Sequence, residues 1–367
     1  MATSKNPADA KAQILQWLQS IRARQSSYSF RLVQARLKTE GMPSAAGWTP
    51  LIAKYTELNH DDSVIDWDRY ASTLGNLHKQ AVMAGTTAVW LFDAPTQDVS
   101  DMLANMQLLE KRGSAFAATF PHPVASDVLL AQRFETEVVQ AIDVGNGVVA
   151  AVACGKRAFR HREQIAAEHV GAQTREEFGD FQELIVVRAG FTQAFDRLVF
   201  RRDAGRFEIH LDLCCPLNTE ELQKMHESYI KRIKPIMERA LGRNLPWLYS
   251  PVNLFPFIES LYNLEDGRVL NLGHSTGTKS IKEERMRGQS LDLRREMFHQ
   301  HGIRAIRGTD AFSIKKGWDS KVGRHTPSIS IPGHFSKAGV AGAVVRHAIV
   351  ENCASMEDFD MVLSKLA

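Results

Sequence analysis

The sequence predicts an α+β protein, with a mainly helical N-terminal part followed by a largely antiparallel sheet built from hairpins with packed helices. Turn signals between apolar runs occur three times, near Asn146-Gly147, Asp203-Ala204-Gly205 and Asp266-Gly267. Helical segments lie between these hairpins, and no repeated strand–helix–strand pattern indicates a parallel sheet. Antiparallel hairpins mixed with helices are typical of the α+β class.

Length and composition favour about two domains. The chain has 367 residues, of which 44% are hydrophobic and 24% charged, as expected for a soluble globular protein with a sizeable core. Pro121-His122-Pro123 is the best candidate for a boundary. We therefore expect a mainly helical region over residues 1–122 and an α+β domain with a basic, Gly-rich C-terminal part over residues 123–367.

The N-terminal region shows helical spacing and one strand. Apolar residues recur every three or four positions over 8–24, which predicts an amphipathic helix. Asp66 can cap a second helix that reaches about residue 84. Residues 86–93 form a short apolar run rich in aromatic and β-branched types, which indicates a buried strand. A further helix is predicted over 96–112.

The rest of the chain alternates hairpins with helices. Helices are predicted over 158–170, over 218–241 after a capping box, and over 355–366. In the second hairpin, apolar residues from Phe207 to Leu213 alternate with Glu208, His210 and Asp212, so one face is expected to be buried and the other wet or functional. A nuclease using Glu208 and Asp212 is conceivable, although no lysine stands at the offset that such sites use.

Several function classes find no support in the sequence. No apolar run approaches the roughly 20 residues needed to span a bilayer, and the first residues lack an apolar signal-peptide core. Four irregularly spaced cysteines do not suggest a disulfide framework and are expected to be small buried hydrophobes. We expect a cytoplasmic protein with no membrane partner.

The net charge of +3 conceals a strong asymmetry. Residues 268–347 hold 15 lysines and arginines against six acidic residues, whereas the remainder of the chain is acidic overall. A segment of this kind can meet phosphate groups of nucleic acid or nucleotide. It can equally be a solvated basic face, or a face that docks on the acidic part of the same chain.

The stretch 267–302 holds the densest chemistry, and its first half allows two interpretations. One is a phosphate-binding loop, because Gly273 and Gly277 follow a strand-like run and Lys279 follows them; Thr278 interrupts the Walker pattern, so only generic anion binding is supported. The other is a nucleophile elbow, because residues 273–277 fit G-x-S-x-G with Ser275 at its centre. The segment that follows lacks the apolar face that an elbow helix needs.

The second half of the same stretch suggests a metal or general acid/base cluster. Asp292, Glu296, His299 and His301 lie close in sequence, and Glu296 and His299 would share one helix face. A single carboxylate–histidine pair does not complete a site, so the sequence assigns no metal, and the cofactor is unknown. Ser275 and these four residues are the catalytic candidates.

The lead hypothesis is binding of DNA, RNA or another phosphate-rich polyanion through the basic C-terminal surface, as part of a larger assembly. The alternatives are a hydrolase or metal-dependent nuclease centred on 267–302, and a protein-interaction component without catalysis. Phe298, Phe312 and Trp318 are interleaved with the cations and are expected to be core residues more often than stacking platforms. The predicted phosphate contacts are Lys279, Lys282, Arg285, Arg287, Arg294, Arg295, Arg304, Arg307, Lys315 and Lys316.

Overall fold

The structure is a computed structural model that describes residues 7–59, 62, 64–179, 181–306 and 308–366. The α-helices in this part of the chain are α1 (Pro7–Arg22), α2 (Phe30–Thr39), α3 (Trp48–Glu57), α4 (Trp67–Ala84), α5 (Thr96–Ala104), α6 (Ala115–Thr119), α7 (Ser126–Ala131), α8 (Ala172–Phe178), α9 (Thr219–Leu241), α10 (Phe257–Asn263), α11 (Met297–Ala305) and α12 (Met356–Leu363). The strands are β1 (Thr87–Asp93), β2 (Glu137–Gly145), β3 (Val148–Ala166), β4 (Glu183–Arg201), β5 (Arg206–Asp212), β6 (Arg268–Thr276), β7 (Ile281–Arg285), β8 (Thr309–Gly317), β9 (Ser328–Ile331) and β10 (Ala348–Glu351).

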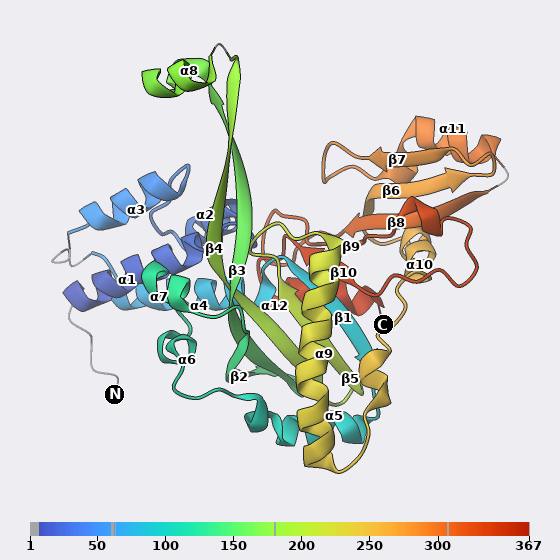
Figure 1. The fold of residues 1–367 in the computed structure, drawn as a ribbon, viewed down its shortest axis with the longest axis horizontal. Helices are drawn as coiled ribbons and strands as arrows, with labels where there is room; N and C mark the ends of the chain where they lie inside the picture. The colour runs from blue at the N-terminus through green and yellow to red at the C-terminus, as the bar shows by residue number, and fades with distance from the viewer. Residues whose placement is uncertain (1–6, 60–61, 63, 180, 307, 367) are drawn as a thin grey trace.

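These elements confirm the α+β class. Within the described residues, the ten strands form one antiparallel sheet in the order β2-β3-β4-β5-β1-β10-β9-β8-β6-β7 (Figure 1). The helices α1 to α4 gather beside it. The sheet takes β1 from the predicted N-terminal region and places it between β5 and β10. The division at residue 122 stays a prediction.

The central strand β1 is buried on both faces, as its apolar run predicts. Trp90 and Phe92 pack in a core with α9 and α5, whereas Val89 and Leu91 point the other way, into a core with α12. A strand covered on both sides needs no polar face. This explains why its sequence does not alternate between apolar and polar residues.

The helix predictions that rest on caps are confirmed. The carboxylate of Asp66 accepts a hydrogen bond from the backbone N of Arg69 at 2.9 Å, so α4 begins where its cap predicts. Asn218 and Glu221 form the capping box of α9, which continues through Pro235 as one helix. None of the helices in the described ranges is both long enough and apolar enough to cross a membrane.

Two of the three predicted hairpin turns are confirmed. Asn146 and Gly147 join β2 to β3 with φ of 54° and 72°, as a two-residue hairpin turn with left-handed backbone requires. Gly205, with φ of 56°, lies in the turn between β4 and β5. The third prediction is wrong in its first half, because α10 precedes Gly267 in place of a strand. Its apolar residues Ile258 and Leu261 have helical spacing and pack into the core beside β6.

The predicted helix over 158–170 is also wrong. Residues up to Ala166 belong to β3, which pairs with β4 along its whole length, from Val148↔Arg201 to Ala166↔Glu183. The two strands leave the sheet as a ribbon that carries α8 at its far end (Figure 1). The β-branched and apolar residues of β4 supply the cross-strand partners that outweigh the helical spacing of this segment.

The expected wet face of β5 is a third prediction that the structure corrects. Glu208, His210 and Asp212 are each at most 1% exposed, because α12 and the N-terminal helices cover that face. Nε2 of His210 lies 2.8 Å from Glu208, and Arg24 forms an ion pair with Asp212 at 2.9 Å. A nuclease site needs carboxylates that a substrate can reach. The interpretation of Glu208 and Asp212 as such a site is therefore not supported by their burial.

Candidate metal centre

The stretch 267–302 folds at the end of the sheet farthest from the ribbon. It supplies β6, the turn after it, β7 and most of α11, and α10 lies nearby (Figure 1). β6 pairs with β7 on one side and with β8 on the other. A β-hairpin with a helix on one face brings side chains from three elements together, although they lie between positions 274 and 299 of the sequence.

The segment Gly273–Gly277 does not form the expected strand-to-helix elbow. It is the end of β6 and the start of a tight turn to β7, in which Lys279 has a positive φ of 61°. Ser275 is part of the strand, and its hydroxyl donates to the carbonyl of Thr276 at 3.3 Å. The residue that points into the protein from this motif is its neighbour, His274, which is 3% exposed.

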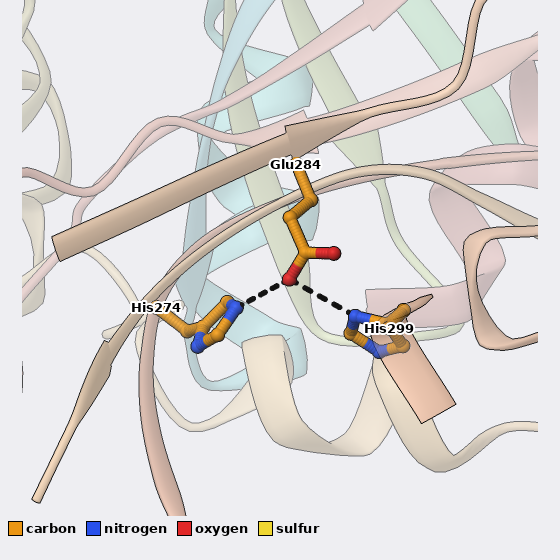
Figure 2. Close-up of side chains that lie close together, drawn as sticks. All are labelled: His274, Glu284 and His299. Atoms are coloured by element: carbon orange, nitrogen blue, oxygen red, sulfur yellow. Dashed lines mark hydrogen bonds and ion pairs between the residues drawn. The ribbon is translucent and has the colours of Figure 1, made fainter. Parts of the chain in front are cut away.

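Three buried or half-buried side chains meet between the hairpin and α11. Oε1 of Glu284, on β7, lies 2.7 Å from Nε2 of His274, on β6, and 3.0 Å from Nδ1 of His299, on α11 (Figure 2). Each residue offers one ligand atom, and the three atoms lie within 4.8 Å of one another. We call these three residues the His274 cluster. Imidazole nitrogens and a carboxylate oxygen are common ligands of divalent transition metals.

The electrostatics of the cluster favour an ionised carboxylate. Burial by itself would raise the pKa of Glu284, but hydrogen bonds from His274 and His299 outweigh it and hold that pKa below its ordinary value. Within the described residues, no lysine or arginine forms a hydrogen bond or ion pair with Glu284. Nδ1 of His274 is buried and has no hydrogen-bond partner there. Lys282 lies on the same face of β7, but within the described residues the partners of the Glu284 carboxylate are the two histidines.

Asp292 and Glu296 hold the backbone around the cluster. The carboxylate of Glu296 caps α11 by accepting from the backbone N of His299 at 2.6 Å. Asp292 accepts from the backbone N of Arg294 at 3.1 Å and of Val269 at 3.2 Å. Both predicted candidates therefore position β6 and α11 and lie outside the His274 cluster. His301 is exposed on α11.

Tyr262 joins the cluster from α10. Its hydroxyl lies 2.9 Å from Nε2 of His299, the ring nitrogen that faces away from Glu284. When His299 donates to Glu284, its Nε2 accepts from the hydroxyl of Tyr262. A metal ion bound to Nδ1 of His299 would replace the hydrogen bond to Glu284 and place the ring proton on Nε2. The hydroxyl of Tyr262 can then accept a hydrogen bond from Nε2. Tyr262 suits both states.

The ten predicted phosphate contacts divide into groups. Lys316 is fully buried and Arg294 is half-buried, and both donate to carbonyls at the end of α10. Burial lowers the pKa of Lys316 to about 8. This corrects the expectation that all ten form one surface, because these two cap a helix C-terminus. Arg307 lies outside the described residues. The exposed members are Lys279, Lys282, Arg285, Arg287, Arg295 and Arg304.

Three of the predicted contacts line one pocket. Arg285, Arg287 and Lys315 surround a volume of about 460 Å³, and no acidic residue is among the described residues that line it. The register aligns Arg285, Asn271 and Lys315 across β7, β6 and β8, so they share one face. Lys315 is paired with Glu351. Because side chains alternate along β7, this cationic pocket lies on the face opposite Glu284.

The aromatic residues among these cations also separate. Phe312 and Trp318 are core residues, as expected, whereas Phe298 is 76% exposed on α11. All four cysteines are buried and free, which confirms their interpretation as small buried hydrophobes.

No protein-family model matches the chain, and no curated protein is similar enough to match it. The function of the chain is therefore inferred from the geometry of the molecule.

Of the three members of the cluster, only His299 is among the candidates that the sequence predicts. His274 lies within the motif that suggests Ser275, and Glu284 lies in the polar segment that follows it. A strand prediction for residues 281–285 would have placed Glu284 and Lys282 on one face. The sequence does not predict this strand, because residues 281–285 are mostly charged and become a strand only by pairing with β6.

Proposed function

We propose that the protein binds a divalent transition-metal ion at the His274 cluster and uses it for hydrolysis. The observation that carries the proposal is the convergence of two imidazoles and one carboxylate, with ligand atoms within 4.8 Å of one another. In a tetrahedral site the ligand atoms lie about 3.3 Å apart. Shifts of a few tenths of an ångström to about 1.5 Å would bring these atoms to that spacing.

The number of ligands favours catalysis over a structural role. Structural zinc sites have four protein ligands, whereas catalytic sites commonly have three and leave a position for water or substrate. A metal ion in such a site supplies a hydroxide nucleophile at neutral pH and polarises the bond under attack. In this chain, Glu284 and the two histidines would hold the ion, and Tyr262 would fix the tautomer of His299.

A pocket beside the cluster offers a place for the substrate. Tyr262, Leu272 and Ala311 line a volume of about 480 Å³, and Leu272 and Ala311 are cross-strand partners of Glu284 and His274. Two carboxylates, Glu259 and Asp310, line it as well. These negative charges favour a neutral or cationic substrate over a polyanion.

Metal analysis of the purified chain tests the proposal. We expect about one zinc, cobalt, manganese or iron ion per chain, and we expect H274A, E284Q and H299A to lose it. Cobalt substitution should give the visible absorption of a four- or five-coordinate ion. A panel of chromogenic phosphate and carboxylic esters and amides would then test for hydrolysis that a chelator abolishes.

H301A is the matched control, because His301 is exposed on the same helix and lies outside the cluster. It should keep the metal content of the natural chain. Equal metal content in the natural chain and in the double variant H274A/H299A would refute the metal centre. Metal binding without hydrolysis of any ester or amide would support the metal centre and refute the hydrolytic activity.

A second candidate function, binding of a phosphate-rich polyanion, is supported by the cationic pocket of Arg285, Arg287 and Lys315. Arg285 and Arg287 have exposed side chains, and guanidinium groups bind phosphate oxygens in a bidentate manner. This pocket and the His274 cluster lie on opposite faces of the sheet. The two proposals can therefore succeed or fail independently.

A salt titration of binding to labelled DNA and RNA tests the second candidate. We expect affinity to fall steeply with salt. R285A/R287A should reduce the slope of log affinity against log salt concentration by about two, because two phosphate contacts are lost. K231A/R239A removes two exposed cations from α9 and should leave the slope unchanged. No binding at low salt, or equal slopes for both variants, would eliminate this candidate.

A further inference from the structure

We infer that two copies of this chain associate through the free edge of β4 in the projecting part of the β3–β4 ribbon. We define this ribbon as residues 156–166 of β3 and 183–193 of β4. It extends away from the rest of the molecule in Figure 1. The inference does not depend on the metal centre, which lies at the opposite end of the sheet.

Both outer edges of the ribbon lack a strand partner in the described residues. Pairing of β3 with β2 ends at Cys154↔Glu137, and pairing of β4 with β5 ends at Arg197↔His210. Beyond these points the two strands pair only with each other. A two-stranded ribbon that is isolated in water is marginally stable, so a ribbon of this length needs further packing.

The ribbon also exposes apolar side chains. Ile185, Val187 and Phe191 of β4 are 56%, 52% and 37% exposed. They are an even number of positions apart, so they share one face of the strand. Single exposed apolar residues are ordinary, but a row on an unpaired strand is a surface that another strand can cover.

The two edges differ in charge. On that same face, β3 presents Arg160 and Arg162, which are cross-strand partners of Ala189 and Val187. Charged side chains are a common means of keeping an edge strand from pairing. The run Leu184–Val187 of β4 contains no charge, no proline and mostly β-branched residues. β4 is therefore the edge suited to a partner.

The charges along the ribbon identify the partner as a second copy. Its stem carries the exposed Arg160 and Arg162, whereas its far end is acidic, because it holds Glu168, Glu176, Glu177 and Glu183 against Arg175. Two ribbons that pair antiparallel about a two-fold axis place the acidic end of each beside the basic stem of the other. A polyanion would meet the acidic end unfavourably.

Sedimentation of the full chain over a range of concentrations tests the inference. We expect a species of twice the 41.1 kDa chain mass. V187K places a charge in the paired strand and should raise the dissociation constant at least about tenfold. V322K is the matched control, because Val322 is 41% exposed and lies outside the ribbon, and it should stay dimeric.

Charge reversal keeps the test decisive if V187K fails to fold. E176R/E177R should weaken the dimer, R160E/R162E should weaken it also, and the two sets combined should restore it. A natural chain that is monomeric at every concentration would overturn the inference. So would a dimer that none of these variants weakens, or a monomer whose binding to DNA is lost in R160E/R162E.

Discussion

Two glutamate–histidine pairs lie in the same sheet, one fully buried and one with a half-buried carboxylate, and they also differ in what surrounds them. On β5, Nε2 of His210 lies 2.8 Å from Glu208, while on the β6–β7 hairpin Nε2 of His274 lies 2.7 Å from Glu284. The first pair is completed by arginines. Arg201 donates to the other carboxylate oxygen of Glu208 at 2.7 Å, and Arg197 lies 3.4 Å from Nδ1 of His210.

The second pair has no such completion. Glu284 contacts two histidines and no arginine or lysine within the described residues, and Nδ1 of His274 has no partner there. A buried carboxylate costs free energy unless a cation and hydrogen bonds compensate it. The protein therefore supplies its own cation on β5, whereas on the hairpin a bound cation would fill that role.

The largest expected difference between the two pairs is in how much each stabilises the fold. E208Q leaves the half-buried Arg201 and the buried Arg197 with less compensating charge and should lower the free energy of unfolding by about 3 kcal/mol. E284Q should lower it by about 1 kcal/mol or less, because no arginine loses a partner. Urea denaturation of the two metal-free variants measures both values. Equal losses would show that the two pairs are alike.

An acid titration gives the next largest effect. Burial lowers the pKa of His210 to about 4, of His226 to about 4 and of His78 to about 3, against an ordinary value near 6.5. Below that ordinary value the unfolded chain takes up protons that the folded chain does not bind. The contribution of these histidines to stability should therefore be constant above about pH 6.5 and fall progressively towards pH 4. At pH 4, each of these histidines should have lowered the free energy of unfolding by on the order of 3 kcal/mol.

His226 allows this prediction to be checked at one position. Its ring stacks on Trp90 with centroids 4.9 Å apart, and both of its nitrogens are buried without a partner in the described residues. H226F keeps the stacking and removes the proton uptake of the unfolded chain, so its stability should depend less on pH between 6.5 and 4. Urea midpoints across this range provide the measurement. A dependence as steep as that of the natural chain would contradict the assigned pKa.

The smallest effect is expected at Tyr262. Y262F removes the hydroxyl that lies 2.9 Å from Nε2 of His299. Loss of such an outer partner commonly costs 10- to 100-fold in metal affinity. Stability without metal should change by about 1 kcal/mol or less, because Tyr262 is only half-buried. Competition with a metal-binding dye gives the affinity, and an unchanged value would separate Tyr262 from the metal centre.

The sequence predicted the parts of the fold that local chemistry determines. Asp66 and the Asn218–Glu221 capping box predict where α4 and α9 begin, because a cap acts within one helical turn. Asn146-Gly147 predicts a hairpin turn for the same reason. The α+β class follows from such local signals taken together.

The parts that failed depend on partners distant in the sequence. Residues 158–166 have helical spacing, but their pairing with β4 decides their structure. Glu208 and Asp212 look like a polar surface, but Arg201 and Arg24 allow them to be buried. In the candidate site, His299 was identified on its own, whereas Glu284 becomes a ligand candidate only when β7 is known to be a strand.

The central position of β1 has a consequence for synthesis of the chain. One edge of β1 pairs with β10, which follows it by roughly 260 residues. At typical ribosomal rates of about 5–20 residues per second, that apolar edge waits on the order of 10–50 s for its partner. During this time an unpaired strand that is apolar from Ala88 to Phe92 is open to contact with other nascent chains. Efficient production is therefore expected to depend on chaperones that shield β1 until β10 has emerged.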